Sequence, residues 1–148
     1  MRRTSFARTA ITVIATSAVV DASVVVRALV EKTPAAVEWL SRIGSEEVRA
    51  ACPTLLYAEV GHAVLRLHRA GALTARAAQR VIDRTLAAPL DAEPLEILVL
   101  PAWGIAVERG LSIYDACYVL LAETREAVLL TADRRLAQAT PNALLITA

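Results

Sequence analysis

The chain has 148 residues, 16 Lys and Arg against 15 Asp and Glu, and a hydrophobic share of 56%. This composition excludes a disordered chain and fits a single globular domain with one well-filled core. No apolar run reaches the roughly 18–20 residues that a membrane span needs, so we expect no membrane contact and a cytoplasmic location.

The first half of the chain alternates short aliphatic runs with longer helical patterns. Residues 1–17 are expected to be a poorly ordered extension that precedes a domain over 18–148, because Thr12 and Thr16 interrupt the apolar middle that a secretory signal would need. The next segments predict, in chain order, a buried strand over 18–22, a helix capped by Ser23, a helix over 33–43 and a strand over 48–52.

The second half of the chain shows the same alternation of aliphatic runs and helical patterns. Its segments predict helices over 54–69 and 74–88, an extended run over 95–100, two helices split at Gly110, a strand over 127–131, a short helix over 132–139 and a last strand over 143–147. Strands and helices in this order predict an α/β fold of three layers, α/β/α, with a central parallel sheet covered on both faces.

Four carboxylates stand in apolar surroundings. Asp21 and Asp133 follow predicted strands, at the sheet edge where open α/β folds bind ligands. Glu59 shares its helix face with an apolar stripe, and Asp115 is the single charge in the helical run 113–122. Each acid alone could be a helix cap or half of a salt bridge. Gathered in one pocket, they would repel each other and need a cation.

Magnesium is the ion that these donors favour. The four groups offer hard oxygen ligands, and no nearby histidine or thiolate pattern indicates zinc, so Mg²⁺ is expected, with Mn²⁺ as an alternative. A divalent ion lowers the pKa of bound water and neutralises charge on a phosphate, which would support hydrolysis of a phosphodiester.

Four segments in order carry a family resemblance: VVDAS, PTLLYAEVGHAVLR, GLSIYDACYVLLAE and LLTADRRLA. The chain resembles the PIN-domain ribonucleases over about residues 18–147, and more narrowly the VapC toxins of bacterial toxin–antitoxin pairs. The resemblance implies that Asp21, Glu59, Asp115 and Asp133 form the catalytic metal site, supported by Thr131 and Ser23. It also implies an RNA substrate, a homodimer and a VapB-type antitoxin that silences the enzyme. His62 departs from the pattern, since relatives commonly carry Asn there.

The basic residues indicate how RNA could be held. If four acids neutralise a metal ion, the remaining surface carries a net positive charge, and phosphate contacts are expected from Arg27, Arg134 and Arg135, with Arg66 and Arg69 as further candidates. Aromatic residues make up only 4% of the chain, too few for a base-stacking platform.

Three other functions compete with a nuclease. A catalytically silent PIN-fold protein-binding module would keep the fold without the chemistry. A di-iron bundle would use the spacing of Glu59 and His62, but it needs a second copy of that motif and no strands. A phosphoacceptor domain would need a lysine after a late strand, and the single lysine is Lys32. A dimer face is expected at Leu73, Ala77, Val81 and Ile82.

Overall fold

A computed structural model describes residues 16–148. Their five strands form one fully parallel sheet in the order β3-β2-β1-β4-β5. The strands are β1 (Ser17–Val20), β2 (Arg49–Pro53), β3 (Leu90–Glu93), β4 (Val128–Thr131) and β5 (Ala143–Leu145). The expected extension over residues 1–17 lies outside the described residues except at its end, where Ser17 already belongs to β1.

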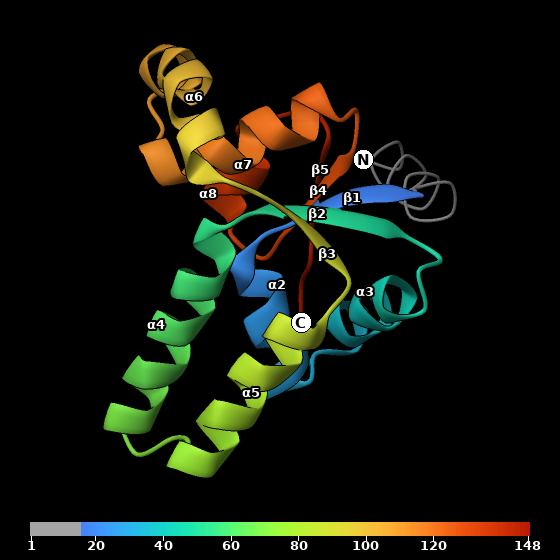
Figure 1. The fold of residues 1–148 in the computed structure, drawn as a ribbon, viewed down its shortest axis with the longest axis vertical. Helices are drawn as coiled ribbons and strands as arrows, with labels where there is room; N and C mark the ends of the chain where they lie inside the picture. The colour runs from blue at the N-terminus through green and yellow to red at the C-terminus, as the bar shows by residue number, and fades with distance from the viewer. Residues whose placement is uncertain (1–15) are drawn as a thin grey trace.

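Helices cover both faces of the sheet (Figure 1). Helices α6 and α7 lie on one side, α2 and α3 lie on the other, and α4 and α5 form an antiparallel pair that projects away from the sheet. Their bounds are α2 (Ala22–Val26), α3 (Pro34–Gly44), α4 (Leu55–Arg69), α5 (Ala75–Ala87), α6 (Leu95–Arg109), α7 (Ile113–Thr124) and α8 (Arg134–Ala137), with a π-helical turn η1 (Arg27–Glu31) after α2. The expected three-layer α/β/α architecture is confirmed.

The central strands are short and aliphatic because both of their faces are covered. Val19 lies between Ala51 of β2 and Leu129 of β4, and all three side chains are buried. Parallel sheets that are buried on both sides take such unbroken apolar runs. The core therefore fixes β1 in the middle of the sheet, and the residue that follows it, Asp21, at the carboxyl edge.

One predicted element is wrong. Residues 95–100 are not extended but form the first part of α6, which continues through Pro101 to Arg109. Apart from Glu96 the run is apolar on every side of the helix, so it has no clear helical periodicity and resembles a buried strand. The strand of this region is instead β3, whose Asp91 and Glu93 both accept hydrogen bonds from Arg125 at the sheet edge.

Within residues 16–148, no single helix is long and apolar enough to cross a membrane. Helices α6 and α7 together meet the length and composition required, but they are bent by 106° at the break between them.

A polar cluster ties α6, α7 and the loop before β5 together. The Arg109 guanidinium donates to both carboxylate oxygens of Glu123, at 2.7 and 3.1 Å, and to the carbonyl of Ala139. The Thr140 hydroxyl donates to the same carboxylate. The bonds from Arg109 lower the pKa of Glu123 below its usual value.

We predict that Glu123→Gln lowers the free energy of unfolding by about 1 kcal/mol at pH 7, because the pair is partly exposed to solvent. A carboxyl whose pKa is lower in the folded state stabilises the fold above its unfolded pKa, and this contribution is lost as the pH falls through the folded pKa. Urea denaturation of both proteins should therefore show a difference at pH 7 that shrinks in acid. A difference that is constant with pH would contradict the assignment.

Candidate functional site

The four expected acids line one pocket. Asp21 follows β1, Glu59 lies on α4, Asp115 lies on α7 and Asp133 lies in the turn after β4, and all four border the same cavity of about 370 Å³. The cavity lies at the carboxyl edge of the parallel sheet, because Asp21 and Asp133 come just after the neighbouring strands β1 and β4. The topology thus gathers carboxylates that are more than 100 residues apart in sequence.

Asp21 is buried and is held by two hydroxyl groups. Its Oδ2 accepts hydrogen bonds from the Ser23 hydroxyl at 2.6 Å and from the Thr131 hydroxyl at 2.8 Å. Each hydroxyl in turn accepts a backbone N–H from the loop after β4: Ser23 from Ala132 and Thr131 from Asp133. The orientation of the Asp21 carboxylate is therefore fixed by two segments of the chain at once.

Asp21 does not act as a helix cap. It occupies the position before α2 in an extended conformation, but its side chain makes no capping hydrogen bond. The prediction that Ser23 caps this helix is wrong, because α2 begins at Ala22 and the Ser23 hydroxyl donates to Asp21 instead. A capping role thus does not explain why a carboxylate is buried at this point.

Glu59 has a partner that the sequence patterns did not single out. The Tyr118 hydroxyl, on a side chain that is almost fully buried in α7, donates to Glu59 Oε1 at 2.7 Å. The signal for this residue is its position, because Tyr118 stands three residues after Asp115 and brings a polar group to an otherwise apolar helix face. Helix α7 therefore supplies one acid of the pocket and orients another.

The other two acids, Asp115 and Asp133, lie at the N-terminal ends of α7 and α8. The Ser112 hydroxyl caps α7 by accepting the N–H of Asp115. Asp133 caps α8, with its Oδ1 accepting the N–H groups of Arg135 and Leu136. Asp133 thus has a structural role in the fold in addition to its place in the pocket wall.

Burial, with charge crowding as a smaller cause, raises the pKa values of three of the four carboxyl groups. Burial raises the pKa of Asp21, and the charge of Asp133 adds to this, while the bonds from Ser23, Thr131 and the Ala22 backbone oppose it. Burial also raises the pKa of Glu59, as do the charges of Asp21 and Asp115, against the bond from Tyr118. The pKa of Asp115 rises for the same reasons, through burial and the charges of Asp133 and Asp21.

The charge of this pocket suits a bound cation, but the positions of its side chains do not form a complete set of metal ligands. Among residues 16–148, none of the ion pairs formed by Lys or Arg involves one of the four acids. Over the same residues, however, no group of three or more Asp, Glu, His or Cys could hold a metal ion as placed. Mg²⁺ commonly takes one or two carboxylates and keeps several waters, so these hard oxygen donors suit it without a closed cage.

The expected phosphate-binding arginines fall into two groups. Arg27 and Arg66 line the pocket, but Arg27 also pairs with Glu31 at 3.6 Å. Arg134 and Arg135 are exposed on α8 beside the pocket, and Arg135 bonds to the carbonyl of Gly110. Arg69 and the exposed His62 are not among the residues that line the pocket.

A family model for the PIN domain matches residues 18–140 of this chain. The chain belongs to the PIN-domain family. Two curated relatives support the assignment, both from Mycobacterium tuberculosis. Ribonuclease VapC3 is 37% identical over 125 residues, covering 84% of this chain and 88% of the relative. Ribonuclease VapC1 is 36% identical over 130 residues, covering 82% of this chain and 89% of the relative.

Solved structures share the fold of this PIN domain. A crystal structure of a Pyrobaculum aerophilum protein has a TM-score of 0.69 and 28% sequence identity, over 88% of this chain and 83% of that one. A toxin–antitoxin complex from Klebsiella pneumoniae contains a chain with a TM-score of 0.64 and 15% identity, over 88% and 98%. At that identity the second likeness concerns the fold alone.

The hydrogen bond from Tyr118 predicts a measurable effect on stability. Tyr118→Phe leaves the half-buried Glu59 carboxylate without this donor, and should lower the free energy of unfolding by about 1–3 kcal/mol at pH 7 without metal. Tyr114→Phe is the matched control, because that side chain is exposed on the same helix. Chemical denaturation that gives both variants the same stability would contradict the proposed role of the Tyr118 hydroxyl.

Proposed function

We propose that this PIN domain is a metal-dependent endoribonuclease of the VapC type, which hydrolyses RNA phosphodiester bonds with water as the nucleophile. The observation that carries the proposal is the single pocket where four carboxylates meet, none of them ion-paired with a Lys or Arg among the described residues. The names of the curated relatives, Ribonuclease VapC3 and Ribonuclease VapC1, support the same chemistry.

Asp21 and Asp115 would be the main ligands of Mg²⁺ or Mn²⁺, with Glu59 and Asp133 holding waters or a second ion. A bound divalent ion supplies a water of lowered pKa and neutralises the charge that builds on phosphorus. The chain's own part is to keep the donors oriented. Ser23 and Thr131 hold Asp21, and Tyr118 holds Glu59, so little reorganisation is needed when the ion and the phosphate arrive.

Arginines beside the pocket would hold the RNA backbone. Arg66 lines the pocket on α4, two helical turns beyond Glu59, and has no ion pair among those of the described residues. Arg134 and Arg135 stand next to Asp133. Phosphate contacts of this kind contribute affinity without reading base sequence, and they make binding strongly dependent on salt.

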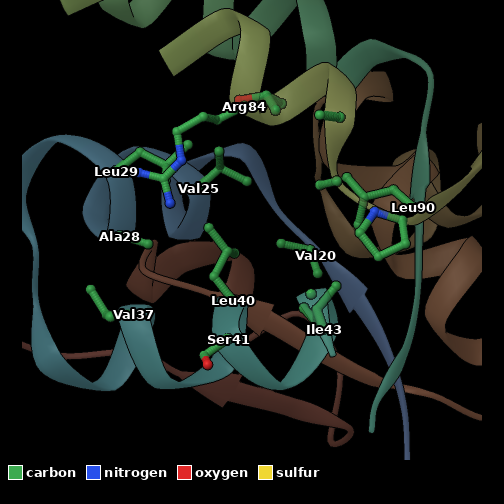
Figure 2. A pocket seen from close by; sticks show the side chains of 15 residues that line it. Val20, Val25, Ala28, Leu29, Val37, Leu40, Ser41, Ile43, Arg84 and Leu90 are labelled. Atoms are coloured by element: carbon green, nitrogen blue, oxygen red, sulfur yellow. The ribbon is translucent and has the colours of Figure 1, made fainter. Parts of the chain in front are cut away.

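We further propose that a VapB-type antitoxin binds to an apolar groove that is separate from the acid pocket (Figure 2). The groove measures about 630 Å³ and lies between α2 with η1, α3 and the end of α5. The solved complex from Klebsiella pneumoniae is titled a toxin–antitoxin complex, which supports a partner of this class. We also propose that the protein is a homodimer.

The groove suggests what kind of segment would fill it. Its walls include Val25, Leu29, Val37 and Leu40, and Figure 2 shows the Arg84 side chain reaching over this apolar surface. An amphipathic helix with an apolar face and one acidic residue opposite Arg84 would match both features. Because α2 and η1 border the groove through Val25 and Leu29 and the acid pocket through Val26 and Arg27, an occupant would lie close to the catalytic side.

Cleavage of RNA is the direct test of the proposed activity. We expect the protein to cut one of transfer, ribosomal or messenger RNA with Mg²⁺ or Mn²⁺, and EDTA to abolish cleavage. Asp21→Asn should reduce the rate by at least about 100-fold, whereas the exposed Glu38→Gln on α3 should not change it. If no RNA class is cut, the catalytically silent protein-binding module becomes the better explanation.

Thermal denaturation shows whether the loss of activity is a loss of fold. Asp21→Asn removes a buried charge while keeping an oxygen for Ser23 and Thr131, so the metal-free variant should unfold at the same temperature as the wild type or higher. Divalent ions should raise the unfolding temperature of the wild type and not that of the variant. An equal shift for both proteins would contradict a metal site at Asp21.

A substitution in the groove should separate inhibition from catalysis. Val37→Glu places a charge in the groove and should prevent inhibition by a VapB-type antitoxin, while RNA cleavage continues. Leu65→Glu is the control, since Leu65 is about as exposed but lies outside the groove and the acid pocket. If the Val37 variant is still fully inhibited, the antitoxin binds elsewhere.

A further inference from the structure

The helical hairpin of α4 and α5 concentrates positive charge. From Val60 to Ile82 the chain has four arginines and two histidines but no Asp or Glu, although the whole chain is nearly balanced, with 16 Lys and Arg against 15 Asp and Glu. The four hairpin arginines are exposed, and none of them forms an ion pair within residues 16–148. They are Arg66, Arg69, Arg76 and Arg80. The hairpin is therefore a surface of one sign that the chain itself does not neutralise.

One face of α4 connects the acid pocket to this charge. Glu59, His62, Arg66 and Arg69 follow one another at spacings of three, four and three residues, which places them on one side of the helix. The buried residues of α4 lie on the other side. Glu59 and Arg66 both line the acid pocket, whereas Arg69 lies beyond it, about 15 Å from Glu59 along the helix axis. This stripe therefore begins in the pocket and leads away from it.

The turn after α4 brings a further arginine to the end of the stripe. The chain reverses between Arg69 and Arg76, and the two helices form an antiparallel pair that projects away from the sheet (Figure 1). The His68 ring donates from Nδ1 to the carbonyl oxygen of Leu73 at 2.9 Å, and Gly71 takes a left-handed conformation with φ of 77°. The tip of the hairpin thus holds its arginines on an ordered turn.

We infer that an RNA strand leaving the acid pocket runs along α4 to the tip of the hairpin, with its phosphates on Arg66, Arg69 and Arg76. The inference rests on the proposed nuclease function and specifies the path of the substrate beyond the point of cleavage. A stacked strand rises about 3.4 Å per nucleotide, so the stripe corresponds to roughly four nucleotides. The substrate is then an RNA that extends at least about four nucleotides from the scissile phosphate on one side.

The charges around the pocket favour this direction. Four carboxylates repel a polyanion, so arginines at the edge of the pocket must attract the RNA. Two arginines line the pocket, and Arg27 is paired with Glu31 at 3.6 Å. Arg66 has no such pair among the described residues, and a guanidinium can donate two parallel hydrogen bonds to one phosphate. The wall on α4 is therefore the one that offers an uncompensated cation to the strand.

An acidic protein segment is the competing occupant of this face. Protein interfaces have an apolar centre with a polar rim. The four members of the stripe include no large apolar side chain, and the apolar groove beside Val25 and Leu29 is the more suitable site for a protein. Phosphate contacts supply affinity for nucleic acid without an apolar centre. An RNA backbone therefore fits the stripe better than a protein does.

RNA binding measured without cleavage tests the path. The probe is a labelled single-stranded RNA of about 20 nucleotides, and EDTA is present so that it is not cut. Arg69→Gln should weaken binding by about 5-fold at about 0.1 M salt. The slope of log affinity against log salt should also fall by about 0.7, since one phosphate contact on a single strand contributes this amount. Fluorescence anisotropy over a range of KCl concentrations measures both quantities.

Two variants separate this contact from net charge and from fold. Arg49→Gln is the matched control, because Arg49 is also exposed but lies at the amino end of β2, away from the carboxyl edge that carries the acid pocket. It should leave the affinity and the salt slope unchanged. Arg69→Lys keeps the charge and should retain most of the salt slope. All three variants should unfold at the temperature of the wild type, because the substituted side chains are exposed.

Cleavage kinetics test whether the stripe and the pocket hold one continuous strand. Arg69→Gln should raise KM and leave kcat unchanged, because a contact far from the scissile bond is equal in the ground and transition states. Shortening the RNA to fewer than about four nucleotides on the side that runs along α4 should raise KM of the wild type in the same way. With that short RNA, Arg69→Gln should have no further effect.

The outcomes distinguish this path from the proposed function. An Arg69→Gln variant with the affinity and salt slope of the wild type would overturn the path, as would a wild type that does not bind the RNA. Weaker inhibition of Arg69→Gln by a VapB-type antitoxin, with RNA binding unchanged, would assign the face to a protein and also overturn it. Binding that depends on Arg69 without cleavage of any RNA would contradict the nuclease function and support the surface.

Discussion

The structure depends on one buried carboxylate. Asp21 follows the central strand, is almost fully enclosed, and is held by the hydroxyls of Ser23 and Thr131, with no Lys or Arg paired to it among the described residues. A charge in such a place destabilises the fold unless it is compensated. Its neighbours add to the difficulty, because Glu59, Asp115 and Asp133 border the same cavity. Under the proposed function, a bound cation would complete this site and offset the repulsion among the four acids.

Sequence patterns could predict the location of the acid pocket, because the order of the strands and the positions of a few acids determine it. Aliphatic runs fixed the parallel strands, and parallel strands bring the residues after β1 and β4 to one edge. The single charge within residues 113–122 and the acid on the apolar stripe of α4 then indicated which helix faces meet that edge. The hydrogen-bond partners of the hydroxyl groups were harder to predict from the sequence. That Ser23 bonds Asp21 instead of capping α2, and that Tyr118 reaches Glu59, depends on side-chain positions which spacing alone does not determine.

The prediction of an extended run over residues 95–100 was wrong for a different reason. Helix α6 is apolar on its outer face as well as on its inner face, and this removes the periodicity by which an amphipathic helix is recognised. The wrong prediction for residues 95–100 and the exposed apolar face of α6 therefore have the same cause. A helix with apolar side chains on its exposed face as well as on its buried face has the composition of an interior segment, and its type is ambiguous from the sequence alone.

The hydrogen bonds around Asp21 also bear on when the protein becomes competent during synthesis. Thr131 and the Ala132 backbone, which fix Asp21 and Ser23, lie about 110 residues downstream of them. Contacts of such sequence separation form late, because the intervening chain must first be ordered. A nascent chain on the ribosome therefore lacks an assembled acid pocket until Thr131 and Ala132 have been translated and have joined the fold.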